Sequence, residues 1–122
     1  MEWNFRSDQP IYTQLTQRLS EAIIAGLYAP GEKLPSVREL AVDAGVNPNT
    51  VQRALAELER EGLVFTQRTA GRFVTENESM IVNARLRLAD ERVAEFLRSM
   101  KTLGCGRDEV LALIAAAKED EK

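Results

Sequence analysis

The 122-residue chain has no histidine and only one cysteine, Cys105. The lack of histidine excludes a histidine-containing catalytic triad and a His-rich metal site. One cysteine cannot form an internal disulfide. No apolar run is long enough to span a membrane or to act as a signal peptide. We therefore expect a cytoplasmic protein that is not an enzyme and needs no cofactor, with no membrane partner. Cys105 fits a small residue in a tight turn better than a redox sensor.

Residues 34–55 predict two short helices joined by a tight turn. Ser36 and Glu39 have the spacing of a capping box at the start of the first helix. Gly45 suits the left-handed conformation that ends such a helix, and Asn47 and Pro48 suit the cap and first position of the next one. Apolar residues repeat at helical spacing in both segments, as Val37, Leu40, Ala41 and Ala44, then Val51, Ala54, Leu55 and Leu58. This pattern is typical of a helix-turn-helix, which places its second helix in the DNA major groove.

The second of these helices has a polar face made by Asn49, Gln52 and Arg53, with the small Ala56 among them. Asn and Gln side chains can pair with adenine, and Arg with guanine. An ordinary solvated helix face has a similar composition, so this face alone does not decide between the two interpretations. The capped helix pair before it and the segment after it favour DNA.

Residues 63–67 and 72–75 are two short β-rich runs separated by a turn that contains Gly71, which predicts a hairpin. A hairpin that directly follows a recognition helix is a wing. Arg68 and Arg72 flank its tip, and Gly71 permits a close approach to a phosphate or to the minor groove. The alternative is a hairpin that only closes the core. Val64 and Phe73 suit that role too, so the two interpretations are compatible.

The chain is not basic overall, since 16 Lys and Arg face 19 Asp and Glu, for a net charge of −3. We expect Arg38, Arg53, Arg68 and Arg72 to converge on one surface. Few phosphate contacts imply weak non-specific binding. Specific binding is therefore expected only from a dimer.

The rest of the chain predicts three more helices. The first covers about residues 10–25, with Ile11, Leu15, Leu19, Ala22 and Ile23 buried, after an arm (residues 1–9) whose Trp3 and Phe5 pack against that helix or against the C-terminal helices. Residues 81–100 form a long helix, and a last helix follows the break at residues 104–106. This two-helix hairpin either folds back on its own chain or pairs with a second copy. We favour pairing because a palindromic site needs two recognition helices in fixed relation. The residues expected at the dimer interface are Leu86, Val93, Phe96, Leu97, Met100, Val110 and Ile114.

Five ordered motifs resemble the GntR family of bacterial transcription regulators, and the length and helical pattern of the remainder resemble its YtrA-type subfamily. The motifs are Pro10-Ile11-Tyr12-x-Gln14, Pro30-Gly31-x-x-Leu34-Pro35-Ser36-x-Arg38-Glu39-Leu40-Ala41, Asn47-Pro48-Asn49-Thr50-Val51, Leu58-Glu59-x-Glu61-Gly62-Leu63 and Gly71-x-Phe73-Val74.

The resemblance implies a mainly α fold with a small β-hairpin. A winged helix-turn-helix domain (residues 1–76) would be followed by a two-helix dimerisation region (residues 77–122). It also implies a homodimeric repressor on a palindromic double-stranded DNA operator, in a subfamily that commonly controls ABC-transporter genes. Whether an unidentified small molecule acts as an effector is left open by the resemblance. The alternative is a winged helix used for protein interaction, with a lapsed DNA face.

The family's DNA contacts carry over to Arg38, Asn49, Thr50 and Gly71. Together with the caps, the polar face and the wing arginines, the DNA-binding set expected is Ser36, Arg38, Asn47, Asn49, Thr50, Gln52, Arg53, Arg68, Gly71 and Arg72. The best-characterised fatty-acid-type members have arginines where this chain has Pro48 and Gln52. An operator sequence therefore cannot be transferred from them.

Overall fold

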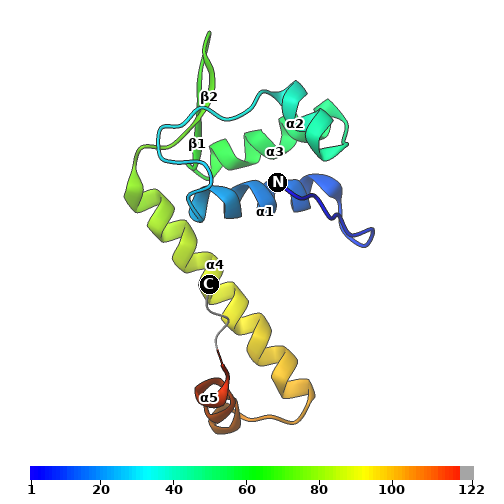
Figure 1. Ribbon diagram of the computed structural model, residues 1–122, viewed down its shortest axis with the longest axis vertical. Helices are drawn as coiled ribbons and strands as arrows, with labels where there is room; N and C mark the ends of the chain where they lie inside the picture. The colour runs from blue at the N-terminus through cyan, green and yellow to red at the C-terminus, as the bar shows by residue number, and fades with distance from the viewer. Residues whose placement is uncertain (119–122) are drawn as a thin grey trace. The chain divides into compact units, whose positions relative to one another are not determined.

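The computed structural model describes residues 1–118 and is mainly helical with one β-hairpin, as predicted (Figure 1). The elements in chain order are α1 (Ile11–Ile24), α2 (Val37–Ala44), α3 (Pro48–Arg60), β1 (Val64–Gln67), β2 (Gly71–Val74), α4 (Glu78–Thr102) and α5 (Arg107–Ala116). Within the described residues, no helix is both long and apolar enough to cross a membrane.

The first compact unit comprises Met1–Ala84, and a second unit begins at Arg85, inside α4. The sequence placed this boundary earlier, after residue 76. The difference arises because Ile81 and Ala84, in the first two turns of α4, are buried in the core of the first unit. We call the first unit the winged unit.

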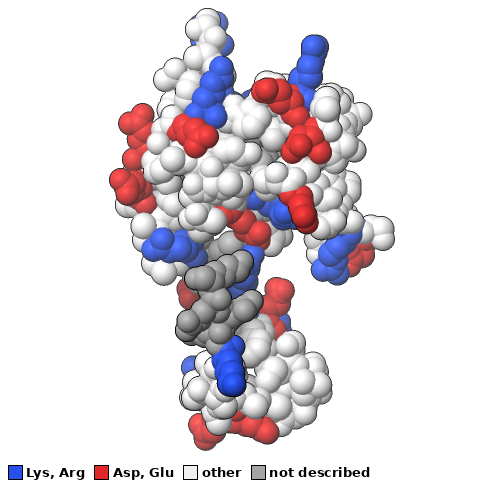
Figure 2. Space-filling view, in the orientation of Figure 1, with Lys and Arg blue, Asp and Glu red and all other residues white. Residues whose placement is uncertain are grey.

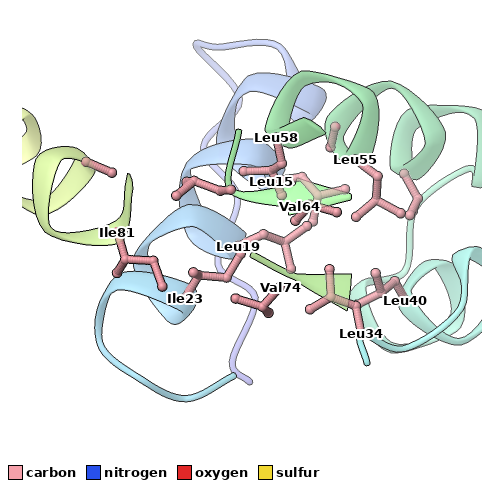
Figure 3. Packing of buried hydrophobic residues seen from close by; sticks show 14 of the residues in the cluster. Leu15, Leu19, Ile23, Leu34, Leu40, Leu55, Leu58, Val64, Val74 and Ile81 are labelled. Atoms are coloured by element: carbon pink, nitrogen blue, oxygen red, sulfur yellow. The ribbon is translucent and has the colours of Figure 1, made fainter. Parts of the chain in front are cut away.

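The core of the winged unit lies where α1, α2, α3 and the hairpin meet (Figure 3). Its fully buried large side chains are Leu15, Leu19, Ile23, Leu40, Val51, Leu55, Leu58, Leu63 and Val74. Helical spacing therefore predicted most of the core correctly. Ile11 was assigned to it wrongly: as the first residue of α1 it lies at the edge of the packed face and is 36% exposed.

The hairpin is antiparallel, with Val64 opposite Val74 and Gln67 opposite Gly71. The segment before α2 runs along its free edge. Leu34 N donates to the Arg72 carbonyl over 2.8 Å, and Val74 N donates to the Glu32 carbonyl over 2.9 Å. The chain that enters the helix-turn-helix is thus hydrogen-bonded to the wing, a pairing that was not predicted from the sequence.

The N-terminal arm packs on its own unit, the first of the two placements expected. The Trp3 and Phe5 rings stack with centroids 5.8 Å apart and pack against the core. Trp3 Nε1 donates to Asp43 Oδ2 over 2.8 Å, which ties the arm to α2. The buried Gln14 of α1 pairs with both backbone groups of Arg6, at 2.6 Å and 2.7 Å.

In the second unit, Val110 is the only buried residue among those that the structure describes. Val110 is 2% exposed within its own chain. A second protein chain would therefore contact the residues around Val110 rather than Val110 itself. The exposed large apolar residues of this unit are Leu86, Val93, Phe96, Leu103, Leu111, Leu113 and Ile114. In Figure 2, the visible surface of α5 and of the end of α4 is correspondingly largely uncharged.

Candidate nucleic-acid interface

Helix α2 begins with the predicted capping box. Glu39 N donates to Ser36 Oγ over 3.1 Å, and Ser36 N donates to Glu39 Oε1 over 2.8 Å. Gly45 ends the helix in the left-handed conformation, with φ of 69°. The first turn of α2 therefore presents the exposed Arg38 beside a helix N-terminus, a place where phosphate is favoured.

The capping box makes the stability of the fold depend on pH. The hydrogen bonds from Ser36, first its backbone N–H and then its side chain, lower the pKa of Glu39 below its ordinary 4.5. A carboxylate with a lowered folded-state pKa contributes stability above its unfolded pKa and loses it as pH falls through the folded one. We expect Glu39→Gln to lose less stability than the wild type between about pH 5 and pH 3. Chemical denaturation at several pH values measures this, with Glu91→Gln as a control; equal pH slopes in Glu39→Gln and wild type would contradict it.

Helix α3 begins at a cap made by Asn47, whose Oδ1 accepts from Asn49 N over 2.8 Å, with Pro48 at the first helical position. Ser36 and Asn47, both predicted to contact DNA, thus already use their side-chain oxygens as helix caps. Asn49 is exposed and Thr50 half-buried at the start of the helix. The residues predicted for the N-terminal end of the recognition helix are therefore all present at its surface.

Two side chains of the polar face of α3 are held by neighbouring elements. The Arg53 guanidinium lies over the Tyr12 ring of α1, with Cζ 3.6 Å from the ring centroid. Gln52 Oε1 accepts from Arg72 Nη2 of the wing over 3.0 Å. Tyr12 was missed as a site residue, because its motif gave no indication that α1 supports Arg53. The predicted Gln52 and Arg72 are brought into direct contact.

The wing tip requires glycine at Gly71, whose φ is +111°. A Cβ there would also lie 3.1 Å from Lys33 Cε, so the Lys33 side chain passes over the glycine. Lys33 thus adds a cation to a wing that also carries the exposed Arg68 and the half-buried Arg72. Lys33 was not among the predicted site residues, since only the pairing of residues 31–34 with β2 places it here.

The charges on this part of the molecule are mixed. Figure 2 shows basic side chains near the hairpin and at the opposite end of the helix-turn-helix, with acidic side chains among them. A mixed surface of this kind supplies few phosphate contacts, which implies weak non-specific binding to DNA.

Comparison with known proteins agrees with this geometry. Residues 11–74 match the family model "Bacterial regulatory proteins, gntR family". Among curated proteins, the uncharacterized regulator YhcF of Bacillus subtilis is 39% identical over 91% of this chain and 92% of its own length. The repressor YtrA of the same organism is 42% identical over 75% of this chain and 72% of its own.

Solved structures give the same assignment. A GntR-family transcriptional regulator from Listeria monocytogenes has a TM-score of 0.86 at 35% identity, covering 93% of this chain and 100% of its own. The DNA-binding domain of AraR in complex with operator ORX1 has a TM-score of 0.57 at 29% identity, covering 62% of this chain and 96% of its own. The resemblance read from the sequence is thereby confirmed. The chain belongs to the gntR family of bacterial regulatory proteins and is a DNA-binding helix-turn-helix transcriptional regulator rather than an enzyme.

Proposed function

We propose that the protein is a homodimeric repressor that binds a palindromic operator in the cytoplasm. Each copy would insert the N-terminal half of its α3 into a major groove and set its wing against the flanking backbone or minor groove. The observation that supports DNA binding most directly is the hydrogen bond between Gln52 of α3 and Arg72 of the wing, because the two elements proposed to contact DNA are then neighbours. One of the relatives named above, YtrA, is described as a repressor, which supports repression.

An exposed apolar seam along α4 supports the dimer. Steps of four and three residues alternate along it from Val82 through Leu86, Ala89, Val93 and Phe96 to Met100, and Leu103, just after the helix, continues the pattern. A repeat of 3.5 residues is the pattern of two helices that pack with knobs in holes. The single chain leaves most of this seam in water, with Leu86 at 55% and Val93 at 56% exposed. Apolar surface of this kind marks an interface, and a second copy of α4 matches its repeat.

The proposed target is an ABC-transporter operon, which the YtrA-type resemblance implies. The competing function, a winged helix with a lapsed DNA face, is not favoured, because cations remain at Lys33, Arg68 and Arg72. Gel shift of the full-length protein on the promoter region of its own gene, followed by genomic footprinting, tests both. Two protected half-sites about one helical turn apart are expected. If the protein shifted all DNA sequences equally, or none, the proposed repressor function would be overturned.

Arg38 provides a test of the phosphate contacts. We expect Arg38→Ala to weaken binding to operator and to unrelated DNA alike and to lower the salt slope by about one. The reason is its exposed place in the first turn of the capped α2. Fluorescence anisotropy over a range of salt concentrations measures both effects. Arg85→Ala, on α4, is the matched loss of charge. Unchanged affinity and slope in Arg38→Ala would remove Arg38 from the interface.

A further inference from the structure

Two hydrogen bonds fasten the wing along one side of α3. Thr66 Oγ1 donates to Glu59 Oε1 over 2.8 Å, and Arg72 Nη2 donates to Gln52 Oε1 over 3.0 Å. Thr66 and Arg72 face each other across the hairpin. Gln52 and Glu59 lie about two helical turns apart, and therefore on the same face of α3. The contact between Arg72 and Gln52 is thus one of two matched ties, rather than an isolated meeting of two surface side chains.

The Arg72 side chain is partly enclosed at this junction. Its Nε is buried and has no hydrogen-bond partner, while its Nη2 reaches Gln52. An arginine on an open surface would hydrate all five of its N–H groups. Arg72 instead leaves one of them unsatisfied, which indicates that packing against the wing and α3 holds the side chain over Gln52.

This contact decides which end of the Gln52 amide is available. A guanidinium only donates, so the atom that it meets is the amide oxygen. A glutamine that reads adenine needs both ends, because its oxygen accepts from N6–H and its nitrogen donates to N7. The amide oxygen keeps a second lone pair, but the positive Arg72 guanidinium beside it weakens it as an acceptor for N6–H. Gln52 therefore offers mainly its two N–H donors to the groove. Guanine offers these donors two acceptors, O6 and N7, and thymine offers O4. Adenine offers only N7, beside an N6–H₂ donor that needs the glutamine oxygen.

We propose that Arg72 is a positioning residue that makes Gln52 a hydrogen-bond donor toward the groove, so that the base facing Gln52 is guanine or thymine and not adenine. This inference rests on the proposed entry of α3 into the major groove. The competing role for Arg72 is a phosphate contact alone. That role would change affinity for every sequence equally and would leave the base preference unaltered.

Selection from a random double-stranded DNA library, with sequencing, separates the two roles. The proteins are full-length wild type, Gln52→Ala, Arg72→Ala and the double variant, with Arg68→Ala as a matched loss of charge from the same hairpin. Gln52→Ala identifies the base-pair position that Gln52 reads, because selection with this variant no longer prefers any base there. The wild type is expected to select guanine or thymine there by roughly five- to tenfold over adenine. Arg72→Ala is expected to shift the base preference at this position toward adenine and to leave the preference at every other position unchanged. In the double variant, where Gln52 is already Ala, the loss of Arg72 should not change the preference at this position.

Three outcomes would overturn the inference. The first is a preference of the wild type for adenine at the position where Gln52→Ala shows no base preference. The second is an unchanged ranking in Arg72→Ala with uniformly lower affinity, as expected for Arg68→Ala. The third, a wild type that enriches no sequence at all, would overturn the operator-specific repressor and this inference with it. The first two leave the proposed repressor standing, so the failures are distinguishable.

Discussion

Replacing Val93 with glutamate is expected to split the dimer and to reduce operator affinity by about 10²–10⁴-fold. Val93 is 56% exposed in the single chain and lies in the middle of the apolar seam of α4. A charge there costs little in a monomer, but it would be buried without a partner if two seams pack together. A monomer then loses the second half-site and the tethering that makes the second binding event intramolecular.

Sedimentation at micromolar concentration and binding to a palindrome measure the two halves of this prediction. Val93→Leu keeps the seam apolar and should remain a dimer with nearly unchanged affinity. A half-site duplex should bind Val93→Glu and the wild type alike, because the winged unit has its own core. The dimer is wrong if Val93→Glu sediments with the wild type, or if the wild type is a monomer that still binds the palindrome tightly.

Local features of the fold could be predicted from the sequence because they depend on neighbours along the chain. The capping box of Ser36 and Glu39, the left-handed Gly45 and the Asn47 cap each involve residues a few positions apart. The apolar repeats of α1 and α3 likewise predicted most of the core. The domain boundary was harder to predict, because the burial of Ile81 depends on a tertiary contact. A truncation at residue 76 would therefore cut into the core of the winged unit.

The arrangement of the candidate site depended on contacts between residues far apart in the chain. Lys33 reaches Gly71 only because residues 31–34 lie along β2. Arg72 meets Gln52 only because the hairpin folds onto α3. Residue type indicated that these side chains suit DNA, but periodicity carries no information on which donor faces which acceptor. The orientation of the reading groups therefore required the structure.

Arg53 is expected to carry a large share of base discrimination, so that Arg53→Ala costs roughly 1–3 kcal/mol of specific binding and relaxes the preference at one step. The physical reason is its exposed place on α3, next to Gln52, with its guanidinium over the Tyr12 ring at 3.6 Å. Stacking on an aromatic face holds the guanidinium plane, while its edge keeps the paired donors that recognise guanine. Competitive binding on the operator and its single-base variants measures both effects.

Tyr12 makes this prediction sharper, because the attraction between a cation and a ring needs the ring and not the hydroxyl. Tyr12→Phe should therefore bind and rank operators as the wild type does, whereas Tyr12→Ala should lose part of the preference at the same step as Arg53→Ala. The two losses should not add in the double variant, since both remove one positioned guanidinium. If Tyr12→Phe were as impaired as Tyr12→Ala, the hydroxyl itself would be the contact. If Arg53→Ala kept the wild-type ranking, Arg53 would be a surface cation held by Tyr12 for stability, and base reading would rest on Asn49 and Gln52.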